Sequence, residues 1–397
     1  MFPKPRPTGS LSLATILGAA ALATTGATLF PNAAQAQHNA LQNASNTAAK
    51  MSAGTGRASG SNASSPNAAT RPIEKTNAAA KQVVQTVPRP RHVFAPTSFW
   101  YQPLPQTTPL HANSANFVAE FLRQKQAYYG TVSINTRAYA CPVYVVGPEV
   151  TPVAVTEWDC QNKGSKDPLL AQQWRAVPIP DYAAPADGTD AEMCIYQPST
   201  DSLWEFWQAR KVNGKWEACW GGGMTNVSQN PGIWERHRGT TATSLPFIGG
   251  QITAEELRRG AIEHVMGIAL VDLEKPGVVS WPATRSDGYN PKDEPNRIPE
   301  GLRFRLDPSV DVEALDMHPV GKIIARAAQK YGFVVWDKAG AITLRADNPK
   351  SFTQQGQEDP YPELFESKPA WSILQGFPWH KLQFLPHDYG KPDTVVK

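Results

Sequence analysis

Leu203-Trp-Glu-Phe-Trp-Gln-Ala209 is a run in which aromatic and polar residues alternate, and an Asn213-Gly214 pair stands between it and a second aromatic run at residues 216–220. An Asn-Gly pair between two such runs is a strong β-hairpin signal, because a type I′ turn requires positive φ at both central residues. Side chains alternate between the two faces of a strand, so Trp204 and Phe206 are expected to face the core. This stretch therefore predicts antiparallel β-structure in the middle of the chain.

The chain beyond Phe94 continues the pattern of short β-branched and aromatic runs separated by Pro, Gly, Asn and Asp. Further strands are predicted at residues 193–196, 261–271, 302–306, 332–336 and 341–345. Helices are predicted at residues 113–129, after a Thr253-Ala-Glu-Glu256 capping box, and at residues 319–331. Many strands with three isolated helices and no βαβ alternation predict an all-β fold, an antiparallel two-sheet sandwich or jelly roll with about three short peripheral helices.

The chain divides into three segments of different composition. Residues 1–36 have the pattern of a secretion signal peptide that ends at Ala34-Gln35-Ala36, and an uncleaved membrane anchor is the alternative. Residues 37–92 contain no Phe, Trp or Tyr, so they are expected to form a disordered, basic, Ala/Asn/Ser-rich linker. Residues 93–397 are expected to form a single β-sandwich domain. The protein is therefore expected to be secreted or periplasmic.

The composition also limits the class of function. Charged residues make up 18% of the chain, and no block of like charge occurs, so a nucleic-acid partner is not expected. All 12 Trp and 11 Tyr residues lie beyond Phe94, which places the core there. The basic linker suits either attachment to an anionic envelope surface or the role of a solvated spacer.

The four cysteines, Cys141, Cys160, Cys194 and Cys219, fit an oxidising compartment. They include no C-x-x-C pair, so no metal site is expected. Apolar runs at 142–146 and 152–156 flank a Gly-Pro-Glu turn, and pairing them as a hairpin predicts a Cys141–Cys160 disulfide. The same reasoning places Cys194 and Cys219 on opposite flanks of the strand at 203–209, about 9 to 10 Å apart, beyond disulfide reach without a bulge or another register.

Glu205 is a candidate catalytic residue because alternation places it beside Trp207, on the face opposite Trp204. A carboxyl group between aromatic surfaces suits sugar cleavage, since the rings stack on a sugar while the acid exchanges a proton with the glycosidic oxygen. The alternative for Glu205 is a cross-strand ion pair with a basic residue of the hairpin.

His264 is a second candidate, in an expected strand whose other positions on the same face are Met266, Ile268 and Leu270. Its side chain titrates near neutral pH, which makes it a candidate for proton transfer. The alternative is a core histidine with one hydrogen bond.

Arg285 and Asp287 lie in Trp281-Pro-Ala-Thr-Arg-Ser-Asp-Gly-Tyr289, a predicted loop after a strand. Binding groups concentrate on such loops, and this pair suits a hydroxyl-rich or carboxylate-bearing sugar. The alternative is an Arg–Asp pair that only fixes the loop.

Six runs carry a resemblance to known proteins: Pro142-Val-Tyr-Val-Val146, Trp204-Glu-Phe-Trp207, Gly249-Gly-Gln-Ile252, Gly260-Ala-Ile-x-His264, Trp281-Pro-Ala-x-Arg-x-Asp-Gly288 and Tyr331-Gly-Phe-Val-Val335. From Phe94 to Leu385 the chain resembles a group of secreted bacterial proteins of unassigned activity. This resemblance implies a secreted all-β domain. In architecture alone such a domain is similar to jelly-roll polysaccharide lyases and glycoside hydrolases.

These features predict a secreted polysaccharide-degrading enzyme with a groove on one sheet, acting on a polysaccharide or cell-envelope glycan without a cofactor. The candidate residues are Glu205, His264 and Asp287 for catalysis, Arg285 for holding the substrate, and Trp207, Trp220 and Trp281 for stacking. Hydrolysis pairs Glu205 with Asp287, whereas elimination uses His264 or a Tyr as the base and Arg285 to neutralise a uronate. The alternative is a non-catalytic carbohydrate-binding or cell-envelope protein.

Overall fold

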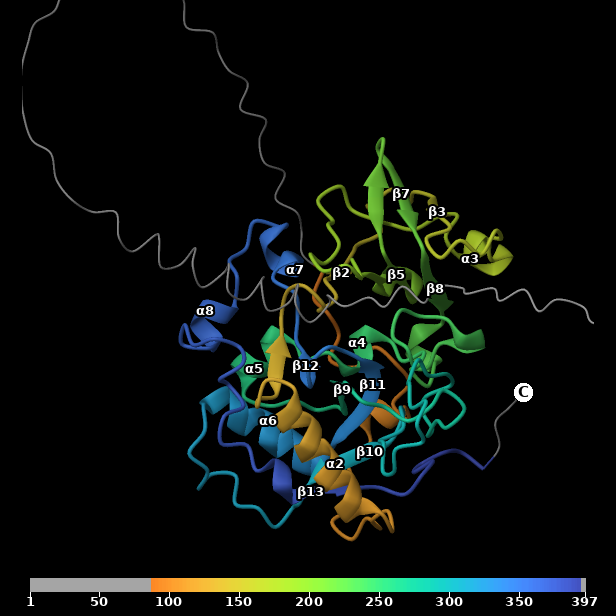
Figure 1. Ribbon diagram of the computed structural model, residues 1–397. Helices are drawn as coiled ribbons and strands as arrows, with labels where there is room; N and C mark the ends of the chain where they lie inside the picture. The colour runs from red at the N-terminus through yellow and green to blue at the C-terminus, as the bar shows by residue number, and fades with distance from the viewer. Residues whose placement is uncertain (1–86, 394–397) are drawn as a thin grey trace, which may run out of the picture. The chain divides into compact units, whose positions relative to one another are not determined.

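A six-stranded mixed sheet is the centre of the structure, a computed structural model that describes residues 87–393 (Figure 1). Its strands are β1 (Ser133–Asn135), β9 (Met266–Leu270), β10 (Arg303–Leu306), β11 (Phe333–Lys338), β12 (Thr343–Arg345) and β13 (Leu382–Phe384). They lie in the order β1-β12-β9-β11-β10-β13. The central neighbours β9 and β11 are parallel, and β1 is parallel to β12 at one edge.

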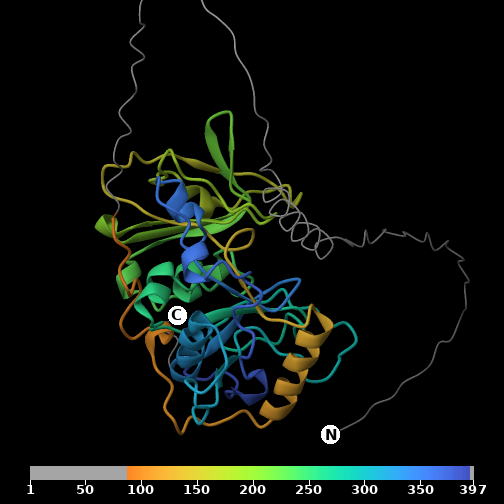
Figure 2. The ribbon, with the colours of Figure 1, turned by 90° about the vertical axis from the view of Figure 1, so that its left-hand side faces the viewer.

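Two smaller sheets come from the middle of the chain. The four-stranded sheet contains β2 (Val143–Val145), β4 (Met193–Gln197), β5 (Ser202–Trp207) and β8 (Trp220–Thr225), in that order. The three-stranded sheet contains β3 (Val155–Glu157), β7 (Lys215–Ala218) and β6 (Arg210–Val212), also in that order. Figure 2 shows the green strands of these sheets on one side of the folded region and the blue strands of the six-stranded sheet on the other.

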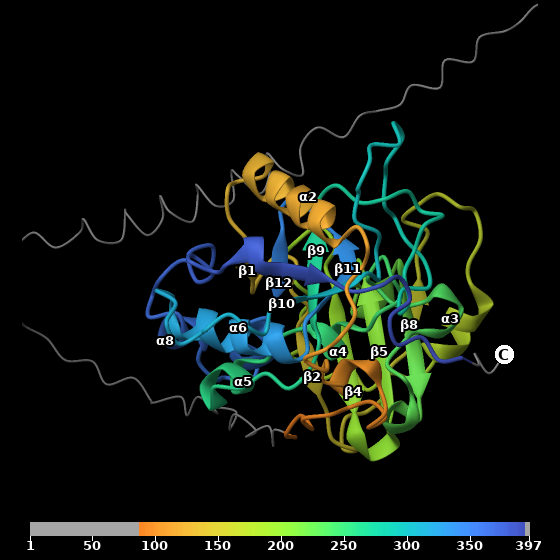
Figure 3. The same ribbon diagram turned by 90° about the horizontal axis from the view of Figure 1, so that it is seen from below.

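Helices α2 (Ser114–Ala127) and α6 (Pro319–Lys330) cover the six-stranded sheet. Figure 3 shows the strands between these two helices. Phe121 of α2 and Ile324 of α6 are fully buried in the same core cluster. The shorter helices are α3 (Pro168–Gln173), α4 (Phe247–Gly250), α5 (Ala254–Arg259), α7 (Lys350–Thr353) and α8 (Tyr361–Leu364), and the 3-10 helices are η1 (Phe99–Tyr101), η2 (Pro198–Thr200), η3 (Val227–Gln229), η4 (Glu235–His237) and η5 (Trp379–Lys381).

The prediction of an all-β antiparallel sandwich or jelly roll was wrong. Parallel pairs occur in all three sheets of the described residues: β9 with β11, β1 with β12, β2 with β4 and β3 with β7. Between β9 and β11 the chain passes through β10 and α6, and this long crossover returns it in the same direction. The strand β10 interrupts any βαβ alternation in the sequence, so the sequence pattern did not reveal the parallel direction.

Several local predictions were confirmed. Asn213 and Gly214 have φ values of 49° and 78°, and they join β6 to β7 as an antiparallel hairpin. The three predicted helices are α2, α5 and α6. α5 begins with the predicted capping box, in which the side chains of Thr253 and Glu256 each accept a hydrogen bond from the other's backbone N–H. These features depend on neighbours in the sequence, which is why a sequence pattern reveals them.

A β-bulge at Trp336 positions an acidic residue of the candidate site. The pairing of β11 with β9 shifts between Val335 and Asp337, which makes Trp336 the extra residue. Its indole lies over Gly267 of β9, where an added Cβ would be 2.2 Å from the ring. The bulge leaves Asp337 within hydrogen-bonding distance of Arg345 on β12.

The last residues of the expected linker belong to the folded region. Nη2 of Arg89 donates a hydrogen bond of 2.5 Å to the carbonyl oxygen of Ile248, and its Nη1 lies 3.4 Å from Oδ1 of Asp347. His92 stacks on Tyr101 with ring centroids 4.0 Å apart. The expected signal peptide and the linker up to residue 86 lie outside the described residues. From residue 87 to residue 393, no helix is both long and apolar enough to cross a membrane.

The predicted Cys141–Cys160 disulfide is wrong, because Cys160 is bonded to Cys219, with Cα atoms 5.6 Å apart. The expected hairpin between residues 142 and 156 does not form, since β2 pairs with β4 and β3 pairs with β7. Cys160 follows β3 and Cys219 follows β7, so this parallel pair brings them together. Cys141 and Cys194 are buried thiols, and burial raises their pKa well above the ordinary value.

We predict that reduction destabilises the protein through loss of the Cys160–Cys219 bond. This bond closes a loop with a sequence separation of 59 residues, which corresponds to about 4 kcal/mol on the chain-entropy treatment. The free energy of unfolding with and without reductant measures the effect. The double variant Cys160→Ser/Cys219→Ser is the control and should not respond to reductant. A peptide map that joins Cys141 to Cys160 would contradict the assignment.

Candidate functional site

Five carboxyl groups and two guanidinium groups interact electrostatically around the C-terminal ends of β11 and β12. We call them the acid–arginine cluster. Its members are Asp190, Glu192, Arg285, Asp287, Glu300, Asp337 and Arg345. They come from the loop before β4, from the segment between β9 and β10, and from the two strands, so the cluster joins the four-stranded sheet to the six-stranded sheet.

Asp337 and Arg345 form the central ion pair of the cluster. Nη2 of Arg345 donates a hydrogen bond of 2.7 Å to Oδ2 of Asp337, and the backbone N–H of Ala242 donates one of 3.2 Å to Oδ1. Arg345 is 2% exposed. Its Nε and Nη1 lack hydrogen-bond partners in the described part of the chain. The pKa of Arg345 is raised above its ordinary value because nearby carboxylates, Asp337 first, outweigh the effect of burial.

Two acids from the loop before β4 approach this ion pair. Glu192 is 2% exposed, and its Oε2 has no hydrogen-bond partner among residues 87–393. Burial raises the pKa of Glu192 to about 8, although Arg345 opposes this shift. Asp190 is half-buried and accepts a hydrogen bond of 3.1 Å from Nε1 of Trp207. Buried groups without partners are uncommon in folded proteins, and strongly shifted pKa values are concentrated at functional sites.

The segment between β9 and β10 supplies a second pair of acids. The backbone N–H of Asp287 donates a hydrogen bond of 3.1 Å to Oε2 of Glu300. Asp287 is exposed, whereas Glu300 is fully buried. Burial, with a contribution from Asp287, raises the pKa of Glu300 to about 8. Although Asp287 is exposed as a residue, partial desolvation of its carboxyl group, together with Asp337, raises its pKa to about 6. The cluster therefore holds protonated and ionised carboxyl groups together near neutral pH.

Arg285 fixes a neighbouring loop. Its Nη2 donates hydrogen bonds to the carbonyl oxygens of Gly239 and Thr241 at 3.0 and 2.7 Å. The side chain is thus committed to backbone carbonyls, and it also contributes positive charge beside Asp287. This arrangement is closer to the expected loop-fixing role than to a free substrate clamp.

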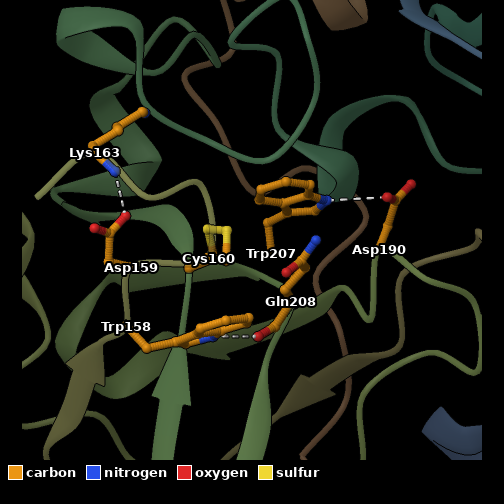
Figure 4. Close-up of a disulfide and its surroundings, with 8 residues drawn as sticks. Trp158, Asp159, Cys160, Lys163, Asp190, Trp207 and Gln208 are labelled. Carbon is orange, nitrogen blue, oxygen red and sulfur yellow. Dashed lines mark hydrogen bonds between the residues drawn. A yellow bond between two sulfur atoms is a disulfide. The ribbon is translucent and has the colours of Figure 1, made fainter. Parts of the chain in front are cut away.

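Two of the three predicted stacking residues are neighbours. Trp207 and Trp220 are directly opposite each other on β5 and β8, and both are half-buried. Figure 4 shows Trp207 with its indole N–H directed at Asp190, close to the disulfide. The backbone N–H of Cys219 donates a hydrogen bond of 2.9 Å to the carbonyl oxygen of Trp207. The disulfide therefore supports the edge of the sheet that carries Trp207.

Glu205 is fully buried and has a structural environment. Its Oε1 accepts a hydrogen bond of 2.6 Å from the backbone N–H of Phe247, and its Oε2 accepts bonds of 3.1 Å from Nε1 of Trp234 and Oγ1 of Thr240. Burial raises its pKa to about 7, against the effect of these donors. The core predictions for Trp204 and Phe206 were confirmed, since both pack in the cluster with Trp174. The opposite face is also covered, which the alternation of the strand did not predict.

His264 also uses both ring nitrogens. Nδ1 donates a hydrogen bond of 2.8 Å to the carbonyl oxygen of Val265, and Nε2 lies 3.3 Å from Oε2 of Glu256. Burial acts to lower the pKa of His264, but the carboxylate of Glu256 prevails and raises it. The pKa of Glu256 falls to about 2, since His264 and the hydrogen bonds outweigh its burial. His264 and Glu256 therefore form a buried ion pair.

The predicted site residues fall into separate environments. Arg285, Asp287 and Trp207 belong to or adjoin the acid–arginine cluster. Trp281 packs edge-on against Phe99, with ring centroids 5.4 Å apart. In the described part of the chain, no hydrogen bond or ion pair connects Glu205 or His264 with Asp287.

The sequence analysis missed four acids and one arginine of the cluster: Asp190, Glu192, Glu300, Asp337 and Arg345. A signal existed for two of them. Asp337 ends the apolar run Phe333-Val-Val-Trp336, and Arg345 ends Ile342-Thr-Leu344, and a charged residue at the end of a buried strand is a candidate site residue. Within residues 87–393, no group of three or more His, Cys, Asp or Glu residues is arranged to hold a metal ion.

Comparisons of the chain with models of protein families, with curated proteins and with solved structures found no match. The resemblance to secreted bacterial proteins of unassigned activity stays a prediction. The functional interpretation therefore depends on the site itself.

We predict that Glu205→Gln destabilises the fold by about 1–3 kcal/mol. The amide NH2 group of the glutamine would face an N–H or O–H group whose hydrogen bond the carboxylate of Glu205 now accepts. Urea unfolding measures this change. Glu217→Gln is the control, since Glu217 pairs with Arg210 at the surface of the hairpin and such pairs contribute about 0–1 kcal/mol. Equal effects of the two substitutions would show that the buried hydrogen bonds of Glu205 carry no special weight.

We predict that stability falls as pH rises from 5 to 8. The folded-state pKa of Glu192 and Glu300, about 8, lies above the ordinary value of 4.5, so in this window the folded protein retains protons that the unfolded chain releases. The stabilisation is complete below about pH 4.5 and is lost as the pH approaches 8. Thermal midpoints across this range measure the trend, and Glu300→Gln should flatten it. Glu294→Gln, at an exposed position of the same segment, is the control and should leave the slope unchanged.

Proposed function

We propose that the protein is a glycan hydrolase that acts outside the cytoplasm, with its active site at the acid–arginine cluster. The observation that carries this proposal is the presence in one cluster of two carboxyl groups in different environments. Asp287 is exposed with a pKa of about 6, whereas Asp337 is ion-paired with Arg345, which opposes the rise in the pKa of Asp337 that burial causes. Two carboxyl groups with different protonation are what hydrolysis of a glycosidic bond requires.

In this mechanism, Asp287 donates its proton to the glycosidic oxygen as the bond to the sugar carbon breaks. Asp337 supports the developing positive charge on the sugar and acts either as the nucleophile or as the base that activates water. The water oxygen ends on the sugar carbon. Its proton passes to Asp287 when Asp337 is the nucleophile, and to Asp337 when Asp337 is the base, after which exchange with solvent restores both groups. Trp207 provides an aromatic surface next to Asp190 for a sugar ring.

Hydrolysis is favoured over elimination, because two of the groups expected for elimination, His264 and Arg285, are committed elsewhere. Both nitrogens of His264 are bonded. Arg285 is bonded to two carbonyl oxygens, so it is poorly placed to neutralise a uronate.

The location outside the cytoplasm is part of the proposal. The signal-peptide pattern at residues 1–36 supports export. The Cys160–Cys219 disulfide is consistent with an oxidising compartment. The secreted and periplasmic locations stay alternatives.

We predict that Asp287→Asn lowers glycan hydrolysis by about 100-fold or more, because proton transfer by a positioned group contributes about 10²–10⁴-fold to the rate. Release of reducing ends from a panel of polysaccharides measures activity. Asp293→Asn is the matched control, since Asp293 is an exposed aspartate of the same segment and pairs only with Lys275 among the described residues. Thermal unfolding of both variants verifies that they are folded.

The pH profile provides a second test of the same assignment. Activity should decline as the pH rises above about 6, where Asp287 loses its proton. A folded Asp287→Asn variant with unchanged turnover would remove the acid from the mechanism. Binding of glycans without release of reducing ends would instead support a non-catalytic carbohydrate-binding protein.

A further inference from the structure

A pocket of about 320 Å³ lies apart from the residues of the acid–arginine cluster. Its walls come from residues 87–93, β2, the end of α4, α5 and α7. The apolar part of the wall includes Val143, Val145 and Phe352. A volume of this size is within the range of small-molecule sites, which combine apolar walls with a few polar groups.

The floor of the pocket is the ion pair of His264 and Glu256. Glu256 is also bonded to the backbone N–H and the hydroxyl of Thr253, each at 2.9 Å. These bonds and the contact with His264 are all on Oε2 of Glu256. Both members of the pair are less than 10% exposed, so the floor is rigid and its charges balance each other.

The other carboxylates that line the pocket are also matched. Asp347 accepts a hydrogen bond of 3.0 Å from the backbone N–H of Ala254 and faces Arg89 at 3.4 Å. Glu255 lies 3.7 Å from Arg259. Each of the three carboxylates that line the pocket therefore already has a cationic neighbour.

Two guanidinium groups of the wall make no hydrogen bond within residues 87–393. Arg258 has no hydrogen-bond or ion-pair partner among residues 87–393. Arg91 lies 3.8 Å from Glu263, an ion pair as loose as that of Glu255 with Arg259, and its side chain is 65% exposed. Both line the pocket. The lining contains five cationic side chains, Arg89, Arg91, Arg258, Arg259 and His264, against the three carboxylates described above.

We propose that this pocket binds a small oxyanion-bearing molecule of about the size of a sugar, with its carboxylate or phosphate on Arg258 and Arg91 and its ring against the apolar wall. Guanidinium groups favour such oxyanions because they form charge-assisted hydrogen bonds in a planar arrangement. The proposal is independent of the proposed hydrolase activity, since its residues are not members of the acid–arginine cluster.

Calorimetric titration of the full folded chain with glucuronate, glucose 1-phosphate and glucose tests the proposal. At least one of the two anions should bind, and glucose should bind at least tenfold more weakly. Binding of glucuronate alone identifies the carboxylate as the preferred group, and binding of glucose 1-phosphate alone identifies the phosphate. Raising the salt concentration should weaken the binding, because Arg258 and Arg91, which would contact the anion, are exposed to solvent.

Arg258→Gln should weaken anion binding at least fivefold, and Arg91→Gln should weaken it as well. Both side chains are at the surface, so these substitutions are expected to preserve the fold. Arg175→Gln is the matched control, because Arg175 is an exposed arginine outside the pocket. Asp287→Asn should leave anion binding unchanged and so separates this site from the proposed active site.

The proposal is overturned if neither anion binds, if glucose binds as tightly as the anions, or if Arg258→Gln and Arg91→Gln leave the affinity unchanged. An equal loss of affinity in Arg175→Gln would show a general effect of net charge and would also overturn it.

Discussion

The buried ion pair between Asp337 and Arg345 is the interaction on which the candidate site depends. It joins the ends of β11 and β12 across β9, and the positive charge of Arg345 also acts on Glu192 and Asp190 from the loop before β4. Removing one partner of a buried pair leaves the other charge without compensation, at a cost of about 3–5 kcal/mol. The pair therefore holds the junction of two sheets as well as the two strands. The bulge at Trp336 is needed for it, since the register shift accompanies the position of Asp337.

Burial alone does not set the pKa of an acid in this protein. The charged and hydrogen-bonding groups around the acid determine the direction of the shift. Glu192 and Glu256 are both buried, but the pKa of Glu192 rises to about 8 while that of Glu256 falls to about 2. Glu256 has an imidazolium and several donors around it, whereas Glu192 has an oxygen without a partner among the described residues and shares Arg345 with Asp337. The first arrangement suits a fixed structural charge. The arrangement around Glu192 keeps its carboxyl group protonated near neutral pH, as acid–base chemistry requires.

The sequence was sufficient for features that depend on near neighbours. The Asn213-Gly214 turn and the capping box of α5 follow from local backbone requirements, and they were correct. Strand direction depends on crossovers such as the one through β10 and α6, so the parallel pairs were missed, and the Cys160–Cys219 bond was missed with them. For the site, the loop acid Asp287 was identified as a candidate because loops carry polar groups. Asp337 could not be connected to it, since that connection depends on a bulge and on the order of strands.

The separation of the two proposed sites has a consequence for the kind of glycan. At the acid–arginine cluster, Arg285 is bonded to the carbonyl oxygens of Gly239 and Thr241, and Arg345 is bonded to Asp337. Arg345 is buried and Arg285 is held by backbone carbonyls, so neither guanidinium group is accessible to an acidic sugar, and the proposed active site would favour a neutral sugar. The pocket has the opposite character, because its carboxylates are matched and Arg258 has no partner among the described residues.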